Sequence, residues 1–309
     1  MEIPRLSDTA SPPGPGRIVW LASYPKSGNT WVRFVLGHLL GQAKSNGNIN
    51  ELAIRDGISS DRADFDDIVG VNAADLPDDA VERLRPRVYE VLSREARNKL
   101  FLKAHDAYTL TPVAEPLFPL QATYRVIHIV RNPLDVAVSW AHHYGVGMDQ
   151  AVRELCDPDH ALSAHPACLN EQLRQRLLNW SGHAASWLAA PLPGVTVRYE
   201  DMLAEPFAIF ANIARFCGIE ATSEAIELAV RASRFDTLKK LEAEGHFRET
   251  YYSAARFFRK GRAGDWRETL SREHAALIVA KHRTMMLELG YADAVAEVET
   301  LAAAFPNPH

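Results

Sequence analysis

The sequence predicts an α/β fold in which helices flank a central parallel sheet. Short hydrophobic runs alternate with longer segments of helical periodicity, which is the pattern of consecutive strand–helix units. The first run, residues 18–23, is apolar along its whole length, as a strand buried on both faces is. It leads through a short loop directly into a helix. Because the sequence shows no internal repeat and no linker, we expect a single domain.

The expected strands and helices follow from hydrophobic spacing along the chain. Strands are expected at residues 18–23, 99–104, 124–130 and 194–199. Helices are expected at residues 30–40, 79–96, 132–144, 169–190, 200–217, 222–232 and 271–289. In the first helix, Val32, Val35, Leu36 and Leu39 recur on a helical period. Residues 41–78 are polar, acidic and rich in Asn, Gly and Asp, so we expect an excursion over the surface.

The two ends of the chain are expected to lie outside the packed domain. Residues 1–16 contain SPPGPG and are expected to form a flexible leader, with the folded domain at 17–303 and a frayed end after it. The N-terminus lacks the basic-then-apolar pattern of a signal peptide, and no apolar run approaches the ~18 residues of a membrane span. We therefore expect a cytoplasmic protein. Cys156, Cys168 and Cys217 are irregularly spaced, so reduced thiols are expected.

The composition and net charge limit the kinds of partner that this chain can bind. It has 309 residues, of which 47% are hydrophobic and 24% charged, which is ordinary for a globular protein. A formal net charge of −5 argues against a broad nucleic-acid-binding surface. Positive charge can still be concentrated in one cleft that takes a small anion.

The stretch IVWLASYPKSGNTW, residues 18–31, predicts an anion site. The first amides of a helix lack partners in the chain, and the helix dipole adds about half a positive charge there. Lys26 adds a full positive charge. The Walker A pattern is absent, because here the lysine precedes the glycine in Lys26-Ser27-Gly28-Asn29-Thr30. We therefore expect a loop that holds a phosphate-like or sulfate-like group without a metal ion.

Three motifs resemble those of the cytosolic-type sulfotransferases, which use 3′-phosphoadenosine 5′-phosphosulfate (PAPS). YPKSGNTW, residues 24–31, is similar to the family's phosphosulfate loop. VIHIVRNPLDVAVSW, residues 126–140, resembles its 3′-phosphate motif, and RKGRAGDW, residues 259–266, resembles the segment that closes over that phosphate. The chain is thus identified as a bacterial-like member of this family. The resemblance implies the P-loop-like sulfotransferase fold, PAPS as sulfuryl donor, adenosine 3′,5′-bisphosphate (PAP) as product, and no metal.

The resemblance also implies which residues hold the nucleotide. They are Lys26, Ser27, Gly28, Asn29, Thr30, Trp31, Arg131, Ser139, Tyr199, Ser233, Phe235, Arg259, Lys260 and Gly261. Arg131 ends an apolar strand, where a guanidinium can bind a phosphate bidentately. Ser139 follows about two helical turns later, so it can share a face with Arg131. Arg234 stands where the family usually has a small residue, which leaves that part of the contact open.

The segment KLFLKAHD, residues 99–106, resembles the family's Lys-x-His segment. Lys103 and His105 point to the same side if the strand persists, because strand side chains alternate. The resemblance implies that His105 is the general base, a role that suits an imidazole with an unperturbed pKa of about 6.5. His142 and His143 are the competing histidines. Asp106 stands near the point where the family has a proline, and we expect this departure to change acceptor contacts more than chemistry.

The function that the resemblance implies is in-line transfer of a sulfuryl group to a hydroxyl or amine of a small-molecule acceptor. Lys26, Lys103 and Ser139 would act beside His105, with Ser139 restraining Lys26 until the acceptor arrives. Two alternatives stay open at this point. A P-loop kinase or nucleotide hydrolase would require magnesium and ATP. A catalytically silent protein would hold PAP as a sensor or scaffold.

The acceptor remains open among phenols, alcohols, lipids, sugars and peptide-linked groups, and so does the oligomeric state. We expect four loops to form the acceptor pocket, at residues 41–78, 106–120, 144–168 and 240–258. The last of these loops carries aromatic residues that would form either a lid or a helix contact, namely Phe247, Tyr251, Tyr252, Phe257 and Phe258.

Overall fold

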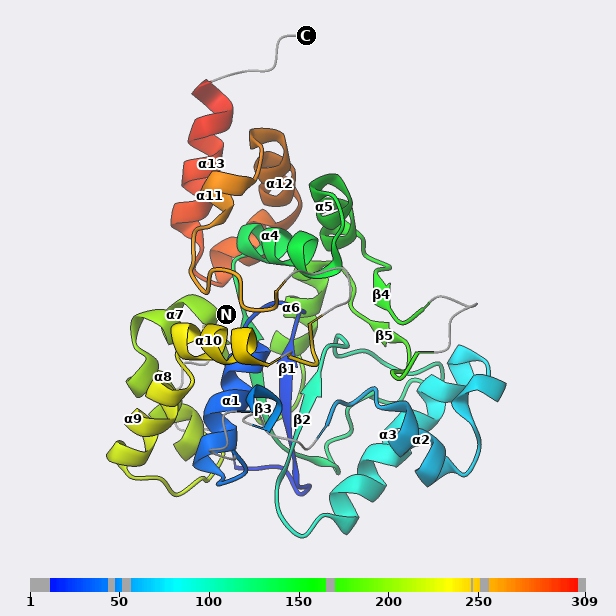
Figure 1. Cartoon of the computed structure of the whole chain (residues 1–309). Helices are drawn as coiled ribbons and strands as arrows, with labels where there is room; N and C mark the ends of the chain where they lie inside the picture. The colour runs from blue at the N-terminus through cyan, green and yellow to red at the C-terminus, as the bar shows by residue number, and fades with distance from the viewer. Residues whose placement is uncertain are drawn as a thin grey trace.

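A four-stranded sheet forms the centre of the computed structural model, which describes residues 12–43, 48–51, 57–164, 170–245, 247–250 and 256–304. The strands are β1 (Ile18–Ser23), β2 (Leu100–Ala104), β3 (Thr123–Val130) and β6 (Gly194–Arg198). Their order is β2-β1-β3-β6, and all neighbouring pairs are parallel. Figure 1 shows helices on both sides of this sheet. The predicted α/β fold class is therefore confirmed.

Alternate residues of β1 face two different helical layers. Val19 and Leu21 belong to a core cluster with residues of α1, α7, α8 and α9. Ile18 and Trp20 belong to another cluster with residues of α3 and α6. Because every residue of β1 is buried, the uninterrupted apolar run is explained by two covered faces. The covering helices are α1 (Asn29–Leu39), α3 (Asp78–Glu95), α6 (Trp180–Leu188), α7 (Tyr199–Ala204), α8 (Pro206–Phe216) and α9 (Ser223–Ala232).

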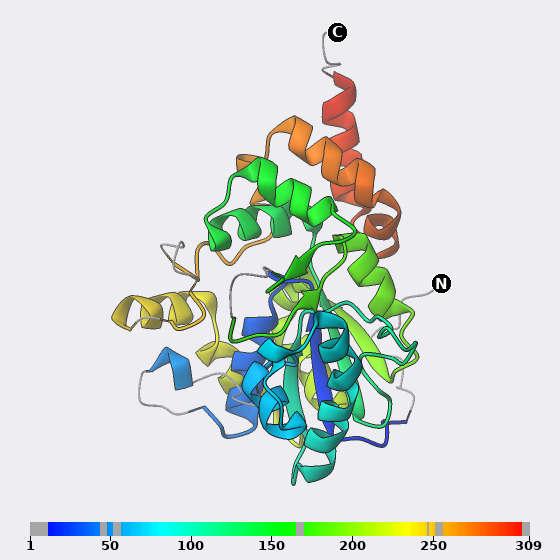
Figure 2. The same cartoon turned by 90° about the vertical axis from the view of Figure 1, so that its right-hand side faces the viewer.

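A further group of helices covers one end of the sheet, as Figures 1 and 2 both show. These helices are α4 (Pro133–Tyr144), α5 (Met148–Cys156), α11 (Trp266–Thr269), α12 (Arg272–Glu288) and α13 (Ala292–Ala304). Their apolar side chains share one core cluster with Tyr24, the residue that follows β1, and with Val130 at the end of β3. The carboxyl ends of the strands therefore open toward this group, where open α/β sheets bind their ligands.

Several helices differ from the sequence-based expectation. The helix expected at 169–190 begins only at α6, where the Asn179 side chain accepts a hydrogen bond from Gly182 N at 2.7 Å. The helix expected at 200–217 is divided, because Pro206 begins α8 and cannot donate to the preceding turn. The elements that were not predicted are short or depend on tertiary packing: η1 (Ile49–Glu51), α2 (Arg62–Val69), η2 (Ala73–Asp75), α5, β4 (Ala161–Leu162), β5 (Gln175–Arg176), α10 (Phe235–Glu244), α11 and α13.

The end of the expected leader contacts the sheet. The amides of Gly14 and Gly16 donate to the carbonyl oxygens of Tyr124 and Thr123, each at 3.0 Å. Residues 1–11, like the expected frayed end at 305–309, lie outside the described part of the chain. None of the helices in the described part is long and apolar enough to cross a membrane.

Candidate active site

The loop between β1 and α1 forms an open turn at the carboxyl end of the sheet. Lys26 has a φ of 71° and Gly28 a φ of 104°, so two residues of the loop adopt left-handed conformations. The Asn29 side chain donates to Leu21 O at 2.7 Å and to Ser23 Oγ at 3.1 Å, which ties the start of α1 back to β1. A Cβ atom at Gly28 would lie 2.6 Å from Cδ2 of Tyr199. Only glycine fits here, and strained backbone of this kind is typical of ligand sites.

The sequence-predicted site residues come together in one cleft of about 1840 Å³. The exception is Ser27, whose fully buried side chain is not part of the lining. The residues that line the cleft include Lys26, Gly28, Asn29, Thr30, Trp31, Lys103, His105, Arg131, Ser139, Tyr199, Ser233, Phe235, Arg259, Lys260 and Gly261. Sites for one drug-sized ligand measure roughly 300–1,000 Å³. The cleft is therefore large enough for a nucleotide and a second molecule side by side.

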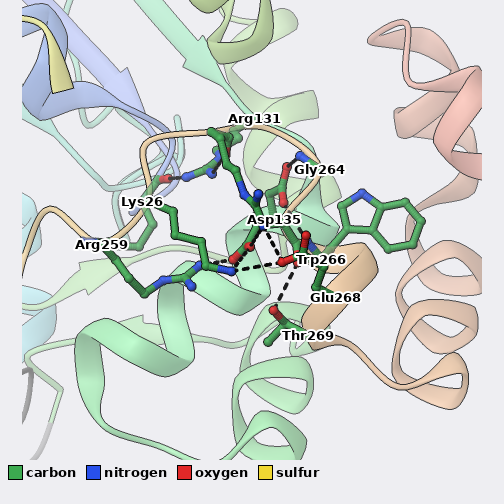
Figure 3. A network of polar contacts seen from close by, with 11 residues as sticks. Lys26, Arg131, Asp135, Arg259, Gly264, Trp266, Glu268 and Thr269 are labelled. Atoms are coloured by element: carbon green, nitrogen blue, oxygen red, sulfur yellow. Dashed lines mark hydrogen bonds and ion pairs between the residues drawn. The ribbon is translucent and has the colours of Figure 1, made fainter. Parts of the chain in front are cut away.

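Arg131 connects two sides of this cleft. Its Nη1 donates to Lys26 O at 3.2 Å, and its Nη2 donates to Arg262 O at 3.1 Å. Its guanidinium carbon lies 4.4 Å from the ring centroid of Tyr199, a cation–π contact. Figure 3 shows Arg131 and the neighbouring Lys26 and Arg259 within this network. The guanidinium is thus held in place by the β1–α1 loop, an aromatic face and the segment after Arg259.

Asp135 and Asp265 order the basic segment that begins at Arg259. The Asp135 carboxylate, on α4, accepts hydrogen bonds from Gly264 N at 2.7 Å and from Trp266 N at 3.1 Å. Arg259 and Lys260 both form ion pairs with Asp265. Burial raises the pKa of the Asp265 carboxyl, but the hydrogen bonds from Lys260 and Arg259 outweigh burial and hold it well below its usual range. Both cations therefore share an internal carboxylate in this structure.

The other side of the cleft is aromatic and contains unpartnered polar atoms. Trp31 lies edge-to-face against Tyr199 and Phe210, with ring centroids 6.2 Å and 5.4 Å away. Trp31 Nε1, Ser233 Oγ and Arg131 Nε are buried without a hydrogen-bond partner among the described residues. Buried polar groups are normally paired. These atoms, set beside aromatic faces and cations, fit a polar, negatively charged ligand with a flat ring.

The tautomer of His105 is set by its hydrogen bond to β1. Its Nδ1 lies 2.8 Å from Ser23 O, and a carbonyl oxygen only accepts, so Nδ1 carries the proton. Nε2 then keeps its lone pair. Burial, followed by the charge of Lys103, lowers the pKa of His105 well below 6.5. The imidazole is therefore neutral at pH 7 and can accept a proton through Nε2.

His143 is a second histidine of the same cleft, whereas His142 is exposed and does not line it. Both lie in the last turn of α4, one turn after Ser139. The His143 ring centroid lies 5.6 Å from that of Phe257. Burial and then the charge of Lys26 lower the pKa of His143 to about 3. His105 and His143 therefore both stay candidates for the base, and for His105 the structure defines the tautomer.

Glu249 is a residue of the cleft that the sequence-based reading did not single out. Its carboxylate lies 2.5 Å from Arg33 Nη1 and 3.9 Å from Lys103 Nζ. Burial raises the pKa of Glu249, but Arg33 and Lys103 outweigh burial and lower it to about 2. The only signal in the sequence was its place in the aromatic segment 240–258, since no motif includes this acid. The cleft thus contains an ionised carboxylate among its cations.

Lys26 is strongly perturbed by this environment. Its Nζ lies 4.2 Å above the centroid of the Phe257 ring. Burial, followed by the charge of Lys103, lowers the pKa of Lys26 from 10.5 to about 7. An anion placed in the cleft would favour the charged form and raise this pKa again. Lys26 is therefore poised to gain a proton when an anion binds.

The cleft continues beyond Lys103 and His105 toward α4, α5 and β4. Its lining there combines aromatic and polar side chains: Trp140, Tyr144, Gln150, Glu154, His160, Asn170, Glu171 and Gln172. Two of the loops expected at the acceptor, 144–168 and 240–258, contribute lining residues, whereas the described residues of 41–78 and 106–120 contribute none. Tyr251 and Tyr252 lie outside the described residues. Among those described, no three or more His, Cys, Asp or Glu residues are grouped as a metal site would require.

The comparison with protein families gives one match over most of the chain. The family model for the sulfotransferase domain matches residues 17–286. Cytosolic sulfotransferase 17 of Arabidopsis thaliana is 28% identical over 278 residues, which cover 84% of this chain and 71% of the relative. Sulfotransferase 1B1 of Canis lupus familiaris is 28% identical over 259 residues, covering 80% of this chain and 76% of the relative.

Solved structures resemble the fold at lower identity. Mouse sulfotransferase SULT7A1 complexed with PAP matches with a TM-score of 0.55 and 17% identity, covering 94% of this chain and 93% of that structure. Retinol dehydratase in complex with androsterone and PAP matches with a TM-score of 0.55 and 20% identity, covering 87% of this chain and 80% of that structure. At this identity the likeness concerns the fold.

Proposed function

The chain belongs to the sulfotransferase family, and from this premise we propose that it transfers a sulfuryl group from PAPS to a hydroxyl or amine of a small-molecule acceptor. One observation supports this proposal most strongly. Three motifs that lie far apart in the sequence line a single cleft with His105, and the cleft has room for two molecules. Two solved structures with the same fold contain PAP, which is consistent with a nucleotide as one of the two molecules.

The described residues fit a bisphosphorylated adenosine. Trp31 and Tyr199 offer aromatic faces, and Ser233 Oγ, Trp31 Nε1 and Arg131 Nε offer unpartnered polar atoms. Arg131, Arg259 and Lys260 would bind the 3′-phosphate, and the amides from Gly28 onward would bind the 5′ end. Because a phosphate competes with Asp265 for Arg259 and Lys260, their ion pairs would loosen on binding. When bound, PAPS supplies the sulfuryl group and a phosphate leaving group.

In the proposed transfer, each of these residues of the chain has a separate role. The oxygen or nitrogen of the acceptor forms the new bond to sulfur, and His105 Nε2 accepts the proton that this atom loses. Lys26, Lys103 and the loop amides stabilise the negative charge that grows as the bond to the bridging oxygen breaks. Ser139 lines the same cleft on α4 and would restrain Lys26 before the acceptor arrives. None of these steps needs a metal ion.

The test is a transfer assay with labelled PAPS and a mixed panel of acceptors, run in the presence of EDTA. We expect transfer to at least one acceptor, with PAP released. Activity that is lost with EDTA and uses ATP would favour a kinase or nucleotide hydrolase instead. PAP binding without transfer to any acceptor would favour a silent nucleotide-binding protein. No affinity for PAPS or PAP would reject the proposal.

Alanine at Gly28 is expected to weaken PAP binding. A side chain at this left-handed position costs roughly 1–2 kcal/mol, so the loop of the variant relaxes away from this shape, and its Cβ would displace Tyr199 from the cleft. Returning the loop to the binding shape then costs PAP about tenfold in affinity. Titration calorimetry with PAP measures the effect. Gly41→Ala is the matched control, since Gly41 also has a positive φ but no atom within 4 Å of the added Cβ. Equal PAP affinity in both variants would contradict the role given to this loop.

Binding of PAP is expected to take up a proton at Lys26. The pKa of this lysine is about 7 in the free protein and rises when an anion binds, so PAP affinity falls as pH increases above about 7. Calorimetry at about pH 8 in buffers of different ionisation enthalpy measures the uptake. Lys26→Met serves as the reference, because the nucleotide's own ionisation cancels in the difference. The same proton uptake in both proteins would show that Lys26 is not its source.

A further inference from the structure

The residue that follows His105, Asp106, belongs to a buried ion pair. The guanidinium of Arg85, on α3, donates two parallel hydrogen bonds to the Asp106 carboxylate, Nη1 to Oδ1 at 3.0 Å and Nη2 to Oδ2 at 2.7 Å. Both side chains are 1% exposed. Arg85 Nε also donates to Tyr89 Oη at 2.9 Å, and Tyr89 Oη donates to Ser59 O at 2.8 Å. Each nitrogen of this guanidinium and each oxygen of the carboxylate makes at least one hydrogen bond, and the pair has no direct access to solvent.

Residues of α6 and β5 hold the backbone that follows β2. His183 Nε2, on α6, donates to His105 O at 3.2 Å, and Trp187 Nε1 donates to Asp106 O at 3.0 Å. Ala107 N donates to Arg176 O at 2.7 Å. Arg176 belongs to β5, which pairs with β4 in a small antiparallel hairpin. The chain around His105 is therefore fixed from α3, α6 and β5 at once.

The same ion pair reaches the wall of the acceptor side. Asp106 Oδ1 accepts from Arg176 N at 3.1 Å, and Arg85 Nη1 donates to Arg174 O at 3.1 Å. Arg176 pairs with Ala161 of β4, and Ala161 lines the cleft. One carboxylate thus joins the base-bearing strand end to the hairpin that borders the second half of the cleft.

Stability alone does not account for such a pair. Replacing a buried ion pair with apolar side chains of similar volume is often neutral or stabilising, because two charges must be taken out of water. A bidentate guanidinium–carboxylate pair does, however, define distance and angle more narrowly than apolar contacts do. We therefore infer that the pair serves to set the relative position of the segments that it joins.

We propose that Arg85 and Asp106 are positioning residues that hold His105 in register with the acceptor wall formed by the β4–β5 hairpin. The inference rests on the proposed sulfuryl transfer and adds to it two residues that touch neither nucleotide nor acceptor. Small displacements of a reacting group lower rates strongly, by about 10²-fold for a shift of about 1 Å. The pair therefore acts on the acceptor half-site and on the rate, and leaves the nucleotide half-site unchanged.

The decisive variant removes both charges together, Arg85→Met with Asp106→Leu, because either single change leaves a lone buried charge. We expect this double variant to stay folded and to keep its PAP affinity, while kcat/KM for the acceptor falls about 10²-fold. Because Arg176 N and Arg174 O lose their hydrogen bonds to the pair, the melting temperature of the double variant should fall, and the assays are run well below it. Arg85→Lys keeps the charge but lacks the bidentate fork. Its kcat/KM for the acceptor should therefore lie between those of the wild type and the double variant. Arg283→Gln with Glu299→Gln, which removes an exposed pair between α12 and α13, is the matched control and should change nothing.

A readout that needs no transfer separates this inference from the proposed function. In protein with ¹⁵N-labelled histidine, we expect the Nδ1–H signal of His105 in the wild type, assigned by its loss in His105→Gln. In the double variant, this signal should broaden or shift, and so should that of His183, which donates to His105 O, while the buried histidines that do not contact this strand end keep theirs. Unchanged His105 signals and unchanged kcat/KM would overturn the inference, as would equal losses of PAP binding and activity. Wild-type protein that transfers to no acceptor would reject the proposed function alone.

Discussion

Alanine in place of His105 is expected to lower the rate of sulfuryl transfer by about 10²–10⁴-fold, the usual contribution of a positioned general base. The hydrogen bond from Nδ1 to Ser23 O leaves Nε2 as the proton acceptor, and the lowered pKa keeps the ring neutral. Both properties are lost with the ring. PAP affinity should stay the same, since His105 is not among the residues that we propose to hold the nucleotide. Single-turnover kinetics with saturating PAPS measures the rate of the chemical step.

His143→Ala is the matched control for this prediction. His143 lines the same cleft and has a lowered pKa, but it comes from the end of α4 rather than from a strand end. We expect its loss to change acceptor KM more than kcat. The reverse pattern, with an active His105 variant and an inactive His143 variant, would assign the base to His143.

Methionine in place of Lys26 is expected to lower kcat by about 10²–10³-fold, as the loss of one charge-stabilising donor does. Methionine keeps the unbranched shape and the contact with the Phe257 ring, so the change isolates the charge. In the proposed mechanism the lysine acts when negative charge develops on the leaving oxygen, so the loss in kcat should exceed any change in PAP affinity.

Comparison of kcat with KM decides whether Lys26 acts in the transition state. Lys240→Met is the control for removal of one lysine charge, since the Lys240 side chain is 79% exposed on α10. A Lys26 variant with raised KM and unchanged kcat would show that this lysine binds the donor equally before and during transfer. That result would move charge stabilisation to Lys103 and the loop amides.

Local patterns in the sequence were sufficient for the fold class and for the positions of the four main strands along the chain. The apolar run of β1, the turn at Gly28 and the periodic helix after it are properties of one continuous segment. Motifs of this kind carry their own geometry, because strand, turn and helix form within a few residues of one another. The family match agrees with them, and the roles of the individual site residues stay predictions.

Local sequence patterns were enough to predict the α/β architecture, the turn between β1 and α1, and the family to which the chain belongs. Only the tertiary structure placed Glu249 beside Arg33 and Lys103, held Arg259 and Lys260 on Asp265, and joined Arg85 to Asp106. The difference has a physical reason. Periodicity reports which face of a segment is buried, whereas an ion pair between distant segments depends on how whole elements pack, and no local pattern records that distance.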